Sequence, residues 1–410
     1  MRFFRKADSW FYIVLLTTLV VAGCGGALGM KSSLLSTTTS PSASAGTGSA
    51  PTPTPSPAPA PTPAPAPTPA PTPSPTPSSP FQADLSATGA WLRSNSVASD
   101  GAILYGSSQI NPYYSNLAAI GLTHDPASYA TVQRWMQWYI NHLNWPDKWG
   151  LYGTTYDYDY NNGVETSRIY ADSTDSYAAT FLTLAWAFYQ TGDAAAQNYV
   201  KSIASQLDSI GGVLIQTQQS DGLTWAKPDY QIKYLMDNCE AYRGLRDLAA
   251  LFQTATGDSS KANYYNAAAD HMLQGIESMW SNGAWAMYKN GAGSLVAPNM
   301  GKWYPDATSQ LFPVLQGVID PSDTRSQQAY TSLNNAWPGW PSMSYNTQDP
   351  FPWVIIGDAA IIMGDAARVT TYIQSIETKY VKNGFPWTWY SAEAGWFMRL
   401  NAYAMGTRPL

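Results

Sequence analysis

Cysteine and histidine are scarce in this chain of 410 residues, which limits the metal and redox chemistry open to it. The two cysteines, Cys24 and Cys239, exclude a disulfide framework and a cysteine-rich metal site, and we expect Cys239 to be a buried thiol. The three histidines, His124, His142 and His271, are far apart and match no pattern of zinc ligands. There is no Gly-Xaa-Ser-Xaa-Gly motif and no phosphate-binding glycine loop. We therefore expect neither a metal nor a cofactor.

Charged residues are few as well. Residues 81–410 hold 18 basic and 27 acidic side chains, a net charge of −9, and these are scattered singly along the chain. Nucleic acid binding needs a surface dense in Lys and Arg, so a nucleic acid partner is excluded. Beyond the N-terminus, no apolar run reaches the roughly 18 residues that a membrane-spanning helix needs.

Aromatic residues, by contrast, are abundant. Residues 81–410 contain 16 Trp, 26 Tyr and 8 Phe, together with many neutral polar side chains. Rings with a polar edge and little charge around them suit a neutral, hydroxyl-rich ligand better than an ionic one.

The first 23 residues are typical of a signal peptide. A short basic segment precedes the apolar stretch 11–21, which is too short to span a membrane comfortably. The stretch ends in Val21-Ala22-Gly23-Cys24, which resembles the lipobox of bacterial lipoproteins. This resemblance implies cleavage before Cys24, acylation of its thiol and attachment to the cell envelope, at the outer membrane in a Gram-negative cell. An ordinary secretory signal with an incidental cysteine is the alternative.

Residues 24–80 have the composition of a tether. Ser, Thr, Ala and Gly dominate up to residue 50, and proline then occupies every second position from Pro51 to Pro77. Alternating proline favours polyproline II at about 3.1 Å per residue, so residues 51–80 reach on the order of 90 Å. Residues 81–410 remain as one folded domain, large enough for a single core.

Helical periodicity continues through the whole domain, without a long alternating strand pattern. Asp193, Asp258 and the pairs Asp125-Pro126 and Asp320-Pro321 are expected helix starts. The expected helices are 84–95, 111–122, 126–143, 173–191, 193–209, 231–255, 258–280, 304–319, 323–336, 351–364, 366–381 and 392–405.

These helices alternate between two kinds. Every second one, beginning with 111–122, is apolar nearly all round, as a buried helix is, and its partners are half polar. The loops that lead from outer to inner helices repeat a pattern of Gly and Trp, seen at 149–150, 222–225, 283–285, 339–340 and 384–389. Six repeated helical hairpins predict an all-α fold, an (α/α)6 toroid with the apolar helices lining a funnel. An open superhelix is the structural alternative.

Acidic residues lie where the inner helices begin. Asp172 and Asp175 are three residues apart, as are Asp237 and Glu240, so each pair shares one helix face. Three further acids lie at the starts of later inner helices: Asp306, Asp349 and Glu393. We expect all of them to converge on one rim of the toroid. The competing interpretations are helix caps, above all for Asp349 and Glu393, and for Asp237 and Glu240 ion pairs with Lys233, Arg243 or Arg246.

Clustered carboxyl groups suit the hydrolysis of glycosidic bonds. One carboxyl must stay protonated to donate to the leaving oxygen, while another must be ionised to activate water or attack, and crowding separates their pKa values. Aromatic rings along the same rim would stack on sugars. The candidates for this binding are Tyr113, Tyr114, Trp149, Trp225, Trp285, Trp303, Trp387 and Trp389.

Two segments resemble a known family. Residues 171–178, Ala-Asp-Ser-Thr-Asp-Ser-Tyr-Ala, are similar to a helix start of the six-hairpin glycosidases, loosely of family 8, whose Asp binds the sugar at the cleavage point. Pro305-Asp306-Ala307 is similar to the segment that holds that family's general base in an inverting mechanism. The family's acid is a Glu at the start of the first inner helix, but residues 109–114 here hold no carboxylate. Either Glu165, Asp175 or Glu240 then supplies the proton, or the chain belongs to a related family with its own arrangement of acids.

The sequence thus predicts a glycoside hydrolase, a monomer that cleaves an envelope or extracellular polysaccharide by inversion. Asp306 is the expected base and Asp175 or Glu240 the expected acid, while Asp172 and Asp237 bind sugar hydroxyls or tune pKa values. One alternative is a polysaccharide lyase on the same toroid, whose product would show a new double bond. The other is a glycan-binding lipoprotein without catalysis, which would release no reducing ends.

Overall fold

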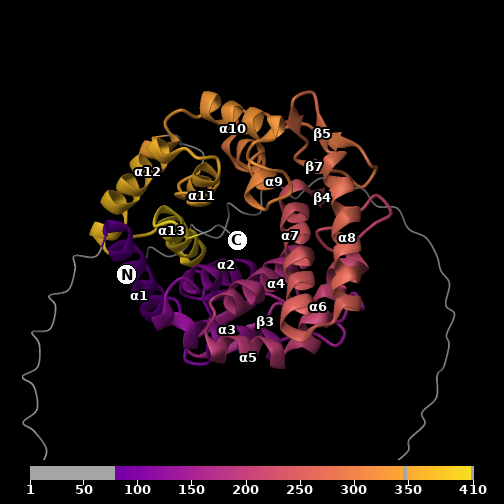
Figure 1. Cartoon of the computed structure of the whole chain (residues 1–410). Helices are drawn as coiled ribbons and strands as arrows, with labels where there is room; N and C mark the ends of the chain where they lie inside the picture. The colour runs from indigo at the N-terminus through magenta and orange to yellow at the C-terminus, as the bar shows by residue number, and fades with distance from the viewer. Residues whose placement is uncertain (1–78, 345–348, 408–410) are drawn as a thin grey trace, which may run out of the picture. The chain divides into compact units, whose positions relative to one another are not determined.

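The computed structural model describes residues 79–344 and 349–407. The signal peptide, Cys24 and the tether up to residue 78 lie outside the described residues. Seen along its axis, the described domain is a ring of helices, with an inner set around the centre and an outer set surrounding it (Figure 1). The outer helices are α1 (Pro80–Asn95), α3 (Tyr129–Asn141), α5 (Ala194–Ser202), α6 (Ala204–Thr217), α8 (Ser259–Glu277), α10 (Thr324–Ala336) and α12 (Ala366–Lys379).

The inner helices follow one another around the ring. They are α2 (Pro112–Leu122), α4 (Thr174–Gln190), α7 (Leu235–Leu251), α9 (Phe312–Leu315), α11 (Ile355–Ile362) and α13 (Ser391–Ala404). Each packs against the next, and α13 packs against α2, so the ring is closed. The predicted toroid of six hairpins is therefore confirmed, and the open superhelix is wrong.

Short strands occur only in the loops of the described domain. One three-stranded sheet joins β1 (Gln109–Ile110), β2 (Tyr158–Asn161) and β3 (Val164–Ser167). A second sheet joins β4 (Lys233–Tyr234), β7 (Tyr288–Lys289) and β8 (Leu295–Val296), while β5 (Trp280–Ser281) pairs with β6 (Ala284–Trp285). These strands order the loops that lead from outer to inner helices.

Some of the helix boundaries differ from the sequence prediction. The helix expected over 193–209 breaks at Ile203, and its second part, α6, continues to Thr217. The helix expected over 304–319 is interrupted: it consists of a π-helical segment, η3 (Trp303–Ala307), with a kink at Tyr304, and the short helix α9, which begins with Pro313 in its first turn. Asp193, Asp258 and Asp125 cap helices as predicted, but Asp323, and not Asp320, caps α10.

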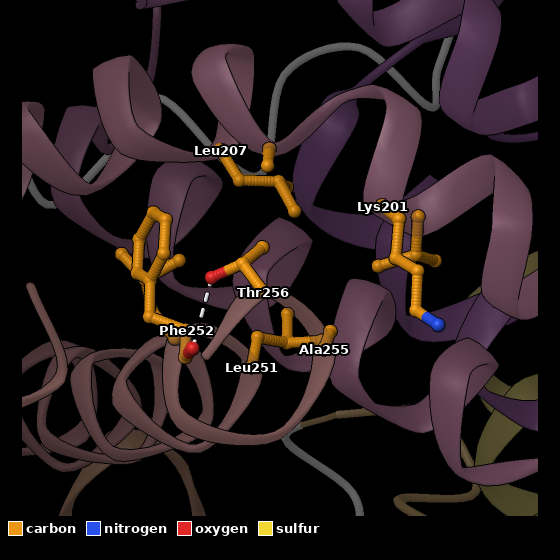
Figure 2. Close-up of a pocket in the computed structure, with 9 residues that line it drawn as sticks. Lys201, Leu207, Leu251, Phe252, Ala255 and Thr256 are labelled. Carbon is orange, nitrogen blue, oxygen red and sulfur yellow. Dashed lines mark hydrogen bonds between the residues drawn. The ribbon is translucent and has the colours of Figure 1, made fainter. Parts of the chain in front are cut away.

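The core occupies the layer between the two sets of helices. Cys239 is a free buried thiol in this core, as predicted. Within the described residues, none of the helices is both long and apolar enough to cross a bilayer. A small apolar hollow lies between the C-terminal end of α7 and the outer helices α5 and α6, lined by Leu207, Leu251 and Phe252 among others (Figure 2). This hollow is at the opposite end of α7 from Asp237 and Glu240.

The ring closes through two glycines. A Cβ on Gly121 of α2 would collide with the backbone of Gly395, and a Cβ on Gly395 would collide with the carbonyl oxygen of Leu117. The backbones of α2 and α13 therefore touch directly, which no other residue type allows at these positions.

We expect Gly395→Ala to destabilise the domain by about 1–3 kcal/mol, because the added methyl forces the two closing helices apart. Gly212→Ala is the matched control, since Gly212 also lies in a helix but its added Cβ would meet only Gln216, at 3.7 Å. That control should be neutral or slightly stabilising. Thermal or urea unfolding of both variants provides the measurement, and equal unfolding midpoints would contradict the closure argument.

Candidate active site

The inner helices begin at one end of the ring, and this end holds the acids. Asp175, Asp237 and Glu393 lie in the first turns of α4, α7 and α13, where the partial positive charge of a helix N-terminus favours a carboxylate. Burial is the largest cause of the raised pKa of Asp237. The negative charges of Asp175 and Glu240 raise this pKa further, and the charge of Asp172 also contributes. The charges of Asp172, Asp175 and Glu240 therefore all act on Asp237.

Ser173 links two of these acids. Its hydroxyl oxygen lies 2.7 Å from Oδ1 of Asp175 and 3.0 Å from Oδ2 of Asp237. Although Ser173 is at the N-cap of α4, its side chain makes no capping hydrogen bond. A hydroxyl has one hydrogen, so it can donate to only one of the two carboxyl groups. Both contacts are hydrogen bonds only when the other carboxyl is protonated and donates to the hydroxyl oxygen.

Asp175 is the ionised member of this pair. It is fully buried and also accepts hydrogen bonds from the Ser176 amide at 2.9 Å and the Thr224 hydroxyl at 2.6 Å. Burial raises the pKa of Asp175 to about 6, although these donors oppose the rise. Asp237 is only half-buried, and burial together with the charges of Asp175 and Glu240 raises its pKa well above the usual value. The pKa of Asp237 is therefore raised with fewer hydrogen-bond donors to oppose the rise than Asp175 has.

Glu240 lies one turn further along α7 and is 3% exposed. Its Oε1 accepts a hydrogen bond from the Tyr113 hydroxyl at 2.7 Å. Burial raises the pKa of Glu240 to about 8, and the charge of Asp175 adds to the rise.

The ion-pair alternative for Asp237 and Glu240 is wrong, because the three cations pair with other acids. Lys233 pairs with Asp221 at 2.6 Å. Arg243 pairs with Asp247 at 2.8 Å, and Arg246 pairs with Asp270 at 2.5 Å.

Asp157 is a site residue that the sequence analysis missed. Its Oδ1 accepts hydrogen bonds from the Tyr177 hydroxyl at 2.7 Å and from Nδ2 of Asn111 at 3.2 Å. Burial raises the pKa of Asp157 to about 7, and the charge of Asp172 also raises it. Asn111 precedes the first inner helix, so Asp157 brings a carboxyl from a loop to the start of that helix. Nothing in the sequence around Asp157 signals this.

Asp172 is the exposed acid of the cluster. Its backbone amide donates to the Tyr177 hydroxyl at 3.2 Å, which holds it at the rim beside Asp157. Tyr304 is 47% exposed, and its ring lies 4.7 Å from that of Trp353.

Two acids have structural partners, but neither caps the helix at whose start the sequence analysis placed it. Glu393 accepts hydrogen bonds from the amides of Trp353 at 3.1 Å and Val354 at 2.8 Å, which are the start of α11 and not of its own helix. Asp349 accepts from the Phe351 amide at 3.0 Å and from Nε1 of Trp353 at 2.7 Å. Both groups shape the loop before α11.

Asp306 and Glu165 have hydrogen-bond partners of their own. Asp306 is buried, and its Oδ1 accepts a hydrogen bond from the Asn299 amide at 2.7 Å. Glu165 is held by Nε2 of His142 at 2.8 Å and by Nε1 of Trp138 at 2.6 Å. Their recorded contacts join neither side chain to Asp175, Asp237 or Glu240.

The aromatic candidates divide into two groups. Trp285, Trp303 and Trp389 are core residues with at most 3% of their surface exposed, so their expected role in sugar binding is wrong. Their position in Gly/Trp loops could not reveal their burial, because aromatic side chains in loops also pack against the ends of the core. The remaining candidates are open to solvent at least in part: Tyr113, Tyr114, Trp149, Trp225 and Trp387.

The comparisons with known proteins show the fold. No family model matches the sequence, and no curated protein matches it. A structure described as a wild-type glycosidase has a TM-score of 0.60 at 13% identity, covering 80% of this chain and 97% of its own. A GH63 mannosylglycerate hydrolase from Thermus thermophilus, solved in complex with glucose, has a TM-score of 0.55 at 13% identity, covering 78% and 99%. The chain thus shares the helical toroid of these glycosidases.

The raised carboxyl pKa values predict that stability falls as pH rises. A carboxyl group with a pKa near 4 in the unfolded chain and a higher one in the folded chain binds its proton more tightly when folded. The stabilisation is complete below pH 4 and is lost as pH rises through the folded values, about 6 for Asp175, 7 for Asp157 and Glu393, and 8 for Glu240. We expect the thermal midpoint to decrease between pH 5 and 8.5.

The variant Glu240→Gln should flatten this decrease, since an amide does not titrate. Glu277→Gln is the control, because Glu277 lies on the outer helix α8 and contacts only Arg325 at 3.6 Å among its recorded ion pairs. Calorimetry across this pH range measures the slope. An unchanged slope in Glu240→Gln would contradict the assignment.

Proposed function

We propose that this domain is a glycoside hydrolase that cleaves a neutral polysaccharide with inversion. The observation that carries the proposal is the pair Asp175–Asp237 joined by Ser173, at the open end of a ring of helices. Hydrolysis of a glycosidic bond needs one protonated and one ionised carboxyl. The likeness of the fold to structures described as glycosidases, one of them with glucose bound, supports the same chemistry.

Asp237 is the general acid in this proposal. It is protonated and half-buried, so it is accessible from the mouth, which is the end of the ring at which the inner helices begin. Asp175 is fully buried and contacts Asp237 through Ser173. Asp237 donates its proton to the glycosidic oxygen as the bond from that oxygen to the anomeric carbon breaks. The Ser173 hydroxyl then turns its one hydrogen from Asp175 to the new carboxylate of Asp237, while Asp175 keeps its hydrogen bonds from the Ser176 amide and the Thr224 hydroxyl.

Asp172 is the general base. It is exposed at the rim, and its charge acts on Asp237 and on Tyr304. Asp172 takes a proton from a water molecule as that water attacks the anomeric carbon from the face opposite the leaving group. The charges of Asp172 and Glu240 both act on Asp237, and Tyr113 donates a hydrogen bond to Glu240. In this proposal, Asp172 takes the role of general base that the family resemblance implied for Asp306.

A leaving-group comparison tests these assignments. Asp237→Asn should reduce the rate on a polysaccharide by about 10²–10⁴-fold, because proton donation is lost. The same variant should lose little on a 2,4-dinitrophenyl glycoside, whose leaving group needs no proton. Asp172→Asn should lose activity on both substrates, and NMR of the first product should show the inverted anomer.

Asp306→Asn provides the contrast with the family-based assignment. This variant should be less stable but keep its rate, because Asp306 bonds the Asn299 amide. The substrate is found by screening residues 79–410 against neutral polysaccharides for new reducing ends. Loss of activity in Asp306→Asn with full activity in Asp172→Asn would overturn the choice of base.

We also propose that the protein is a lipoprotein of the cell envelope, anchored through Cys24 and acting as a monomer on a polysaccharide near the membrane. The support is the lipobox-like sequence and the tether of Ser, Thr, Ala and alternating Pro that follows it.

Metabolic labelling of the full chain with a palmitate analogue in a bacterial host tests the anchor. Cys24→Ala should abolish the label and release the protein from membranes. Cys239→Ala is the matched control, since the only other cysteine is buried in the fold. Label retained in Cys24→Ala would contradict the proposal.

A further inference from the structure

A continuous wall of aromatic rings leads away from the acid cluster. It begins at Tyr113, which donates to Glu240, and passes to Tyr114, then Tyr390, Phe351 and Trp387. Each ring touches the next, with centroids 5.5, 5.3, 5.4 and 5.7 Å apart in that order. Exposure rises along the wall: the first four rings are half-buried, whereas Trp387 is 60% exposed.

Aromatic rings also lie on the other side of the cluster. The Tyr170 hydroxyl is 3.5 Å from Oδ1 of Asp172, and its ring lies under Lys227 Nζ at 3.9 Å. Lys148 Nζ lies 5.6 Å from the same ring and 4.4 Å from the ring of Trp149. Tyr170 and Trp149 therefore extend outward from Asp172 as the first wall extends from Glu240.

The first wall begins on α2, the neighbour of α4 in the inner ring, and runs past the start of α13 to the far side of the mouth. Tyr170 and Trp149 belong to the loop that enters α4, while Phe351 belongs to the loop that enters α11. In the closed inner ring, α4 and α11 are three positions apart and so stand on opposite sides (Figure 1). A pyranose ring is about as large as one aromatic ring, so a wall of five rings is longer than a single sugar.

These features point to the way the substrate is bound. We infer that the two walls form one groove across the mouth, which holds a neutral glycan chain on both sides of the cleaved bond, so that the enzyme cuts within the chain. A sugar presents C–H groups on its ring faces, and these pack on aromatic faces without needing charge. The acid cluster lies between the walls, so the bound chain crosses it. This inference rests on the proposed glycoside hydrolase function.

Binding to inactive protein tests the groove separately from catalysis. In the Asp237→Asn background, we compare Trp387→Ala and Tyr170→Ala with Tyr264→Ala, whose ring is 55% exposed but lies on the outer helix α8. Affinity electrophoresis uses gels with hydroxyethyl cellulose, laminarin, galactomannan or soluble starch. We expect at least one polymer to retard the protein. The affinity for that polymer should be roughly threefold to tenfold weaker in each groove variant and unchanged in Tyr264→Ala.

Cleavage by the otherwise unaltered domain then tests the position of the cut. Viscosity of the retarding polymer should fall well before reducing ends accumulate, and the loss caused by Trp387→Ala should grow with the length of the oligosaccharide. Monosaccharide as the sole early product, or equal weakening by Tyr264→Ala, would overturn the inference. A third outcome is binding that depends on Trp387 and Tyr170 without any cleavage. This outcome would reject the proposed hydrolysis and the cut within the chain, but it would support the groove as a glycan-binding surface.

Discussion

The hydroxyl of Ser173 has a single hydrogen and lies between two carboxyl groups, and the chemistry of the mouth depends on this constraint. Asp175 is surrounded by donors and stays ionised, so Asp237 must hold a proton to complete the contact. The arrangement needs α4 and α7 side by side, since each helix brings one of the acids. A protonated, half-buried acid next to an exposed one, Asp172, follows from this packing.

The closed ring of helices offsets part of the repulsion between the carboxyl groups at the mouth. Like charges at the mouth raise each other's pKa values, which costs stability above neutral pH, and the fold opposes this with positive helix ends and a buried cation. Arg399 of α13 is buried in the ring interior, and its charge lowers the pKa of Glu240, Asp247 and Asp358 against the effect of burial. His124 lies near the same guanidinium, and burial lowers its pKa to about 4, so this histidine is neutral. The Gly121–Gly395 contact permits α13 to approach closely enough to place Arg399 there.

Features that depend on short stretches of chain were predictable. The alternation of apolar and half-polar helices predicts six hairpins, because burial of a helix face repeats every 3.6 residues whatever the partner is. Asp193 and Asp258 cap their helices through bonds to amides three residues on. The spacings of Asp172 with Asp175 and of Asp237 with Glu240 are likewise local, so the convergence of the acids could be expected once the hairpins were.

The sequence by itself therefore determined the helical class, the ring and the helix starts at which the acids gather, since each of these follows from local periodicity and spacing. Only the tertiary structure decided which acids share a proton, because the partners of Ser173 lie on different helices, 64 residues apart in the case of Asp237. The same holds for Asp157, brought beside Asn111 from 46 residues away, and for Asp306, which accepts a hydrogen bond from the Asn299 amide. Burial of Trp285 and exposure of Trp387 also depend on packing between distant segments, which composition and spacing do not contain.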